Sequence, residues 1–222
     1  MKDCISDTFQ GTSHIENQDG FLIIEEVDYS LLFVLDGVSR SLHPKEGVEL
    51  AIQYITNNHK EYFGINTYYL NELMYKVNES IIQSNYDDAL TTYCASCILE
   101  SDRNKIILSN LGDSRIYLLD QDKIQSVTED DTLFPGSNIL TRCLGIKDLN
   151  KDDFRVVEIE LKNQNILLCS DGFYSFLEAN EREFIQIFNI QKTSIIKSLL
   201  KEKVKGKNFD DSTYIFMSNT AE

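Results

Sequence analysis

Short apolar runs recur along this chain, and most are joined by polar segments too short to hold a crossover helix. Residues 21–26 and 31–35 form the first pair, and the polar residues between them predict a β-hairpin. Similar runs predict further strands at residues 93–99, 105–109, 114–119, 154–160, 165–169 and 213–218. Because parallel neighbours need a connection of about a dozen residues or more, these short links predict mostly antiparallel sheets.

Helical periodicity appears between some of the strands. Residues 45–58 and 69–84 each carry apolar side chains three and four positions apart, which is typical of one buried helix face. Two further helices are expected at residues 179–188 and 192–204, before the last strand. Helices in these positions would cover the outer faces of packed sheets. We therefore expect an α+β fold, a four-layer α-β-β-α sandwich with two mostly antiparallel central sheets.

The composition limits the number of domains and the kinds of partner. Only two prolines occur and no Gly/Ser-rich linker is present, which favours a single domain over residues 1–222. A net charge of −15 argues against non-specific binding to nucleic acid or to an anionic membrane, and it favours divalent cations. No apolar run reaches the ~18 residues of a membrane span, and residues 1–7 are too polar for a signal peptide. Five cysteines without a framework spacing indicate a cytoplasmic location.

Two of the predicted strands end at an Asp-Gly pair, Asp36-Gly37 and Asp171-Gly172. Asp-Gly is also a favoured hairpin turn, and for either pair alone the turn is the stronger interpretation. Three further aspartates, Asp19, Asp113 and Asp210, stand at the edges of other predicted strands. Five carboxylates at strand ends favour a site for a hard cation, Mg²⁺ or Mn²⁺.

Clustered carboxylates with two cations suit phosphoryl chemistry, because the cations activate a water and neutralise charge on the phosphate oxygens. A zinc site is disfavoured, since His14, His43 and His59 are scattered along the chain. Cys97 and Arg103 have the spacing of a cysteine phosphatase, but two acids and no glycine lie between them. A phosphate cradle needs exposed backbone N–H groups and no negative charge, so we interpret that match as chance.

Six motifs in order along residues 10–218 resemble those of the metal-dependent serine/threonine protein phosphatases, type 2C. The motifs are Asn17-Gln18-Asp19, Phe33-Val34-Leu35-Asp36-Gly37, Asn110-Leu111-Gly112-Asp113-Ser114-Arg115, Leu140-Thr141-Arg142-Cys143-Leu144-Gly145, Cys169-Ser170-Asp171-Gly172 and Asp210-Asp211-Ser212-Thr213. The resemblance implies the same α-β-β-α sandwich, with two Mn²⁺ or Mg²⁺ ions at one end of the sheets.

The resemblance also assigns roles to the aspartates. Asp36 would bridge the two ions, and the Gly37 carbonyl would bind one of them. Asp171 and Asp210 would complete the shell of the other ion, so that Asp36, Asp171 and Asp210 carry catalysis. Asp19 would bind an ion directly, or it would contact a ligand of the ion without binding the ion itself. Asp113 would share a third, weaker ion with Asp171, or else it is a turn or cap residue.

The chain departs from the family pattern where the substrate phosphate is held. The family usually has an Arg three residues before the Asn-Gln-Asp motif, and this chain has His14 there. His14 is one candidate for binding the phosphate, although a histidine cannot make the bidentate contact of an Arg, or it is a polar surface residue. Arg40, close to Asp36 in sequence, could take over phosphate binding, or it is a solvated loop residue. The segment between Pro135 and Leu140 is also short, so the flap that the family commonly carries there is expected to be trimmed.

The leading hypothesis is a Mn²⁺- or Mg²⁺-dependent phosphatase that hydrolyses phosphoserine or phosphothreonine on proteins. In this mechanism a metal-bridging water attacks phosphorus directly. One alternative is a catalytically weak or inactive module that binds phosphorylated partners or regulates a kinase. Another is a hydrolase of small phosphate esters. A phosphorylated protein is the expected partner, a cognate Ser/Thr kinase a further one, and a monomer the expected state.

Overall fold

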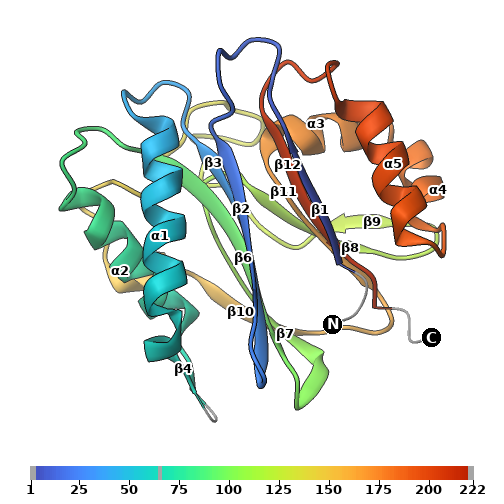
Figure 1. The fold of residues 1–222 in the computed structure, drawn as a ribbon, viewed down its shortest axis with the longest axis horizontal. Coiled ribbons are helices and arrows are strands. Elements are labelled where there is room, and N and C mark those ends of the chain that lie inside the picture. The colour runs from blue at the N-terminus through green and yellow to red at the C-terminus, as the bar shows by residue number, and fades with distance from the viewer. Residues whose placement is uncertain (1–3, 65–66, 220–222) are drawn as a thin grey trace.

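Two antiparallel sheets stack face to face between two layers of helices (Figure 1). The computed structural model describes residues 4–64 and 67–219, so the polar N-terminal residues 1–3 lie outside the described part. Each main sheet has five strands, and all of the pairings within them are antiparallel. The predicted α-β-β-α sandwich is therefore confirmed.

The first sheet has the order β10-β7-β6-β3-β2, and the second has the order β1-β12-β11-β8-β9. The strands of the first are β2 (Asp19–Glu25), β3 (Tyr29–Gly37), β6 (Thr91–Leu99), β7 (Asp102–Leu111) and β10 (Val156–Glu160). Those of the second are β1 (Cys4–Phe9), β8 (Arg115–Leu119), β9 (Ile124–Ser126), β11 (Asn165–Cys169) and β12 (Ser212–Met217). A small hairpin, β4 (Phe63–Gly64) and β5 (Thr67–Tyr68), lies apart from both sheets.

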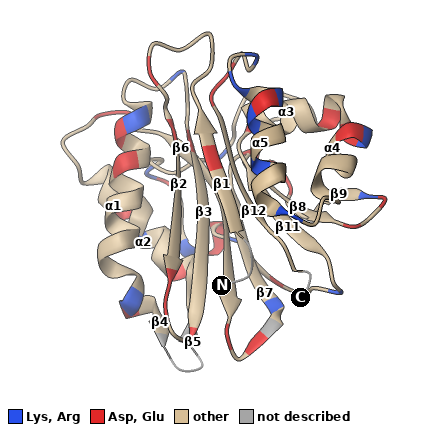
Figure 2. Cartoon of the chain, turned by 45° about the vertical axis from the view of Figure 1, so that its right-hand side comes forward, with Lys and Arg blue, Asp and Glu red and all other residues tan. Residues whose placement is uncertain are grey.

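Helices cover the outer face of each sheet, as Figure 1 shows. Helices α1 (Pro44–Tyr62) and α2 (Leu70–Ile82) pack on the first sheet. Helices α3 (Asp171–Ala179), α4 (Glu181–Phe188) and α5 (Thr193–Val204) pack on the second. Lys and Arg are interspersed with Asp and Glu along α1, α4 and α5 (Figure 2). Among the helices that the structure describes, none has the length and apolar character that a membrane span requires.

Strand β3 explains why its sequence is a continuous apolar run. Leu31, Phe33 and Leu35 belong to the core beneath α1 and α2. Leu32 and Val34, which alternate with them, belong to the core between the two sheets. Because successive side chains of a strand point to opposite faces, a strand buried on both faces has no polar alternation.

Three features differ from the expectation or were absent from it. The helix expected at residues 179–188 is α4, but a further helix, α3, was not predicted; it begins at Asp171 and only Asn180 separates it from α4. Asp171-Gly172 therefore starts a helix and is not a hairpin turn. Strand β1 was not predicted either, since its sequence has little apolar pattern; it is held at a sheet edge by pairing with β12. The short strand β9 pairs only with the end of β8.

Candidate metal centre

Two carboxylates face each other across the first sheet. Asp19, the first residue of β2, is directly opposite Asp36 near the end of β3. Directly paired residues on neighbouring antiparallel strands lie on the same face of the sheet. Asp36 also continues the alternation of Leu32 and Val34, so this face is the one between the two sheets. The apolar layer between the sheets thus ends in acidic side chains.

A serine from the second sheet holds Asp19. Ser170, fully buried between β11 and α3, donates a hydrogen bond from its Oγ to Asp19 Oδ2 at 2.7 Å. The same Oγ accepts the backbone N–H of Thr213 at 2.9 Å. One hydroxyl therefore connects β2 in the first sheet with β12 in the second, at the end where the carboxylates lie.

Helix α3 begins against the backbone that precedes β12. A Cβ added to Gly172 would lie 2.0 Å from the carbonyl oxygen of Asp211, a distance that no side chain can occupy. Glycine is needed at this position because the two segments touch through their backbones. This contact brings Asp171, the first residue of α3, next to the segment that carries Asp210.

Burial and mutual repulsion raise the pKa values of four of these acids. Burial, followed by the neighbouring carboxylates Asp211 and Asp171, raises the pKa of Asp19 to about 8, against the hydrogen bond from Ser170. The pKa of Asp36 is raised well above its usual value by burial and then by four other aspartates, which are Asp19, Asp171, Asp113 and Asp210.

The same two causes act on the remaining members. Burial, then Asp171 and Asp130, raises the pKa of Asp113 to about 7. Burial, then Asp210, raises the pKa of Asp171 to about 6, although a hydrogen bond with Asp36 acts in the opposite direction. These interactions show that all five predicted aspartates come together. Half-buried carboxylates that disfavour one another's charge are a donor set that a divalent cation neutralises, so the residues fit Mn²⁺ or Mg²⁺.

Asp211, which the sequence reasoning did not select, fixes the loop over this centre. Its buried carboxylate accepts the backbone N–H groups of Gly11 at 2.6 Å and Gln18 at 2.7 Å. His14 Nδ1 lies 2.9 Å from Asp211 Oδ2 and 3.5 Å from Asp210 Oδ1. One nitrogen and two carboxylates here are close enough together to hold a metal ion. The available signal was the second acid of the Asp210-Asp211 pair.

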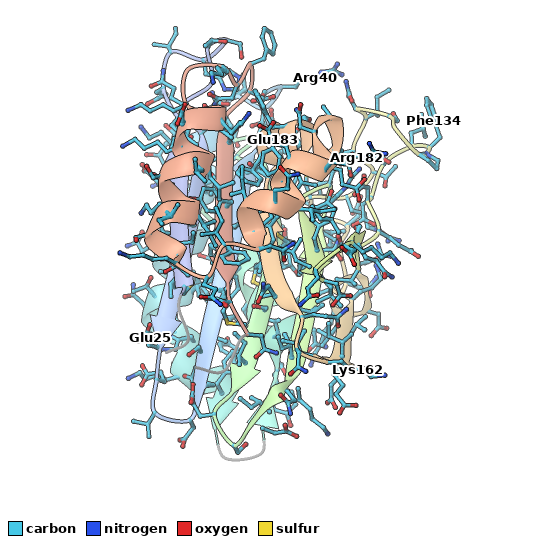
Figure 3. All side chains as sticks on the ribbon, turned by 90° about the vertical axis from the view of Figure 1, so that its right-hand side faces the viewer. Glu25, Arg40, Phe134, Lys162, Arg182 and Glu183 are labelled. Carbon is cyan, nitrogen blue, oxygen red and sulfur yellow. The ribbon has the colours of Figure 1, made fainter. Side chains whose placement is uncertain are left out.

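Arg40 lies on the loop between β3 and α1, which leads away from Asp36. The loop is held by the N–H of Val38, which donates to the carbonyl of Leu90 at 3.0 Å. The Arg40 side chain is exposed, and no ion pair or hydrogen bond joins it to another part of the described chain. Figure 3 places Arg40 at the same end of the molecule as Phe134, opposite Glu25 and Lys162.

Residues 132–140, which we call the flap, are anchored beside Asp113. Buried Asp131 accepts the N–H of Gly112 at 3.1 Å and contacts Arg155 at 2.5 Å and Arg142 at 3.3 Å. Gly112 has a φ of +95°, and a Cβ there would meet Thr92 at 2.5 Å. Only glycine therefore lets the chain turn tightly enough to place Asp113 beside the other acids.

The cysteine alternative finds no support in the environment of Cys97. Cys97 is buried in β6, and burial raises the pKa of its thiol to about 12, which disfavours a reactive thiolate. The side chain of Arg103 lies outside the described part of the chain.

Comparison with known proteins gives a consistent picture. The family model described as Protein phosphatase 2C matches residues 10–205. The chain is similar to the serine/threonine phosphatase stp of Listeria innocua, with 26% identity over 206 residues, covering 80% of each chain. It is also similar to the protein phosphatase PhpP of Streptococcus pneumoniae, with 26% identity over 166 residues, covering 65% of this chain and 66% of the relative.

Solved structures show the same fold. The serine/threonine phosphatase Stp1 of Staphylococcus aureus superimposes with a TM-score of 0.83 at 18% identity, over 100% of this chain and 96% of that one. The serine/threonine phosphatase PstP/Ppp of Mycobacterium tuberculosis gives a TM-score of 0.75 at 19% identity, over 97% of each chain.

Proposed function

This chain belongs to the protein phosphatase 2C family, and we propose that it is a Mn²⁺- or Mg²⁺-dependent phosphatase acting on phosphoserine and phosphothreonine in proteins. The observation that carries the proposal is the meeting of five aspartates at one end of the sheets, where burial and mutual repulsion raise the pKa of Asp36 most clearly. A cognate Ser/Thr kinase would supply the phosphorylated protein.

The metal ligands proposed are those that the motifs indicate. Asp36 would bridge two ions with the Gly37 carbonyl on one of them, and Asp171 and Asp210 would hold the other. Asp113 would share a third, weaker ion with Asp171. Bound at this centre, Mn²⁺ or Mg²⁺ supplies the positive charge that polarises the phosphate and makes water acidic enough to attack phosphorus near neutral pH.

The other residues orient this centre. The hydrogen bond from Ser170 fixes the orientation of the Asp19 carboxylate, which would act on an ion or on a ligand of that ion. Asp211 fixes the loop that carries His14, and its own N–H donates to Asp210 Oδ1 at 2.8 Å. That bond limits the rotation of the Asp210 carboxylate.

Arg40 is the better candidate for the phosphate-binding side chain. Nδ1 of His14 is already engaged with Asp211, whereas the Arg40 guanidinium makes no ion pair or hydrogen bond with the described residues. An Arg binds two phosphate oxygens at once, which a histidine does not. We therefore assign Arg40 to the phosphate and His14 to the orientation of the Asp210-Asp211 segment.

The second candidate function is a weak or inactive module that binds phosphorylated partners. The observation in its favour is His14, which stands where the family usually has the phosphate-binding Arg and is held by Asp211. Against it stands the complete set of five aspartates, because these carboxylates repel one another and a cation between them removes that repulsion.

Hydrolysis of p-nitrophenyl phosphate and of a phosphothreonine peptide, with and without Mn²⁺, tests the proposal. We expect Mn²⁺-dependent turnover that is lost in Asp36→Asn and kept in Asp122→Asn, a change at the exposed β8–β9 turn. Thermal unfolding with Mn²⁺ adds a second readout, since an ion bound only by the folded state raises Tm. Full activity in Asp36→Asn would overturn the assignment. Mn²⁺-dependent stabilisation without turnover would favour the inactive module.

A further inference from the structure

Large apolar side chains are exposed around the carboxylate end of the molecule. Of the twelve such side chains in the described chain, seven lie on loops at this end: Tyr86, whose ring packs against His43, and six others. Three of these six, Ile15, Leu42 and Phe209, are among the four most exposed, with 101%, 72% and 76% of the side chain accessible. The other three lie on the flap: Leu133, Phe134 and Ile139. We call these six residues the apolar collar.

Hydrogen bonds and an ion pair hold the first half of the collar together. Ser13 donates from both its N–H (3.1 Å) and its Oγ (2.6 Å) to the carbonyl of Phe209, which joins the loops carrying Ile15 and Phe209. Lys45 at the start of α1 pairs with Glu16 at 2.6 Å. That pair ties the loop of Ile15 to the helix that follows Leu42.

The flap half is also fixed in place. The N–H of Leu133 donates to the carbonyl of Ile139 at 2.9 Å, so the flap closes on itself. Its base is the buried Asp131, which is bonded to Gly112 next to Asp113. Figure 3 shows Phe134 on a loop that projects from the body of the protein at the end where Arg40 lies.

The collar is continuous in sequence with the proposed catalytic centre. Ile15 follows His14, Phe209 precedes Asp210, and Leu42 lies two residues after Arg40. An extended peptide spans about 3.3 Å per residue, so a phosphoserine that reaches the aspartates must carry its near neighbours across these loops. The collar is therefore the surface that the residues flanking a phosphorylated side chain meet.

We propose that the collar binds protein segments with apolar side chains on both sides of the phosphorylated residue. This inference rests on the proposed phosphatase function and names the substrate class of the same site. Contact between apolar surfaces is favourable and non-directional, so the collar selects for apolar flanks without requiring one fixed motif. An acidic flank is disfavoured, because the chain has a net charge of −15.

Two phosphoserine peptides of equal length test the proposal on the full chain with Mn²⁺. One carries Leu and Phe two and three positions from the phosphoserine on each side, and the other carries Ser and Gln there. We expect wild-type kcat/KM to be higher for the apolar peptide. The variants Phe209→Ser, Leu42→Ser and Phe134→Ser should each reduce that preference by about threefold to tenfold, because each removes a partly exposed apolar contact.

Activity on p-nitrophenyl phosphate is measured for every variant as the reference, so the readout is the ratio of peptide to ester hydrolysis. Val27→Ser is the matched control, since Val27 is 88% exposed on the β2–β3 turn at the opposite end. Its ratio should equal that of the wild type. Fluorescence anisotropy with the same labelled peptides measures docking independently of turnover.

The outcomes separate the two proposals. If the ester is hydrolysed, and the two peptides have equal kcat/KM and bind equally well, the proposal about the collar is overturned and the proposed phosphatase function stands. If the ester is not hydrolysed, the proposed phosphatase function is rejected. The anisotropy then tests the collar alone, because tighter binding of the apolar peptide supports it and equal binding overturns it. Sedimentation that shows a dimer of the wild type and monomers of the collar variants would assign the surface to a second copy of the chain, and so also overturn the proposal.

Discussion

Replacing Ser170 with Ala tests whether one hydroxyl joins the two sheets at the metal centre. The variant removes the donor to Asp19 Oδ2 and leaves the buried N–H of Thr213 without its acceptor. A hydrogen bond to a charged group contributes roughly 1.5–3 kcal/mol, and an unsatisfied buried donor costs about 1–3 kcal/mol. Since the two terms share one atom and are not additive, we expect the free energy of unfolding to fall by about 2–4 kcal/mol.

Urea unfolding in Mn²⁺ measures this change, and a thermal scan should show Tm lower by about 4–16 °C for a chain of this size. The loss should be larger in Mn²⁺ than in EDTA, because the hydrogen bond from Ser170 favours the charged form of Asp19 that a cation requires. The apparent affinity for Mn²⁺ should therefore weaken as well.

Ser126→Ala provides the matched control. Its Oγ donates to the carbonyl of Thr128 at 3.2 Å on the exposed strand β9, so its removal should change stability by less than about 0.5 kcal/mol. If Ser170→Ala unfolds at the same urea concentration as the wild type, with unchanged Mn²⁺ affinity, the reasoning about the bridging hydroxyl is wrong.

Three further predictions concern the same end of the molecule. In EDTA, the raised pKa of Asp19 means that the folded state binds more protons than the unfolded chain from about pH 4 to about 8, so stability should fall as pH rises through this window. Urea unfolding at several pH values checks this, and a flat profile would contradict it. Gly172→Ala forces a Cβ against the Asp211 carbonyl and should lower the free energy of unfolding by about 1–3 kcal/mol or more. In thermal unfolding, the rise in Tm that Mn²⁺ causes should also be lost. Wild-type Mn²⁺ stabilisation in this variant would refute the close approach. Arg40→Ala should raise KM for a phosphopeptide about tenfold or more, whereas Arg182→Ala on the exposed face of α4 should not. If the KM of Arg40→Ala equals that of the wild type, phosphate binding would be assigned to His14 instead.

The layer order and the clustering of the aspartates were predictable because both depend on short local stretches of sequence. Strand β3 is apolar at every position from Leu31 to Leu35, which only a strand buried on both faces needs. The aspartates follow or precede such strands directly, so their position along the sheet is set by the ends of the strands. Strand β1 lacks this pattern, and pairing with β12 supplies its stability from a distant part of the chain.

The supporting contacts could not be predicted, because they join residues far apart in sequence. Asp211 binds Gly11 and Gln18, which precede it by about two hundred positions, and nothing local marks the partnership. The engagement of His14 with Asp211 likewise depends on the fold, and it changes which side chain is available to the phosphate. The start of α3 was missed because Asp-Gly is common both in turns and at helix starts, and only the contact of Gly172 with Asp211 distinguishes them.

Asp36 occupies the position at which the inter-sheet stripe of Leu32 and Val34 would continue with another aliphatic residue. A single change to Val would therefore extend this apolar stripe and remove a carboxyl group that its neighbours disfavour, and the metal-free protein would become more stable as its catalytic activity is lost. In this architecture, a substitution that abolishes catalysis can thus raise the stability of the metal-free protein. Selection for turnover alone keeps a carboxylate at that place, and a lineage released from such selection would keep its shape while it lost its activity.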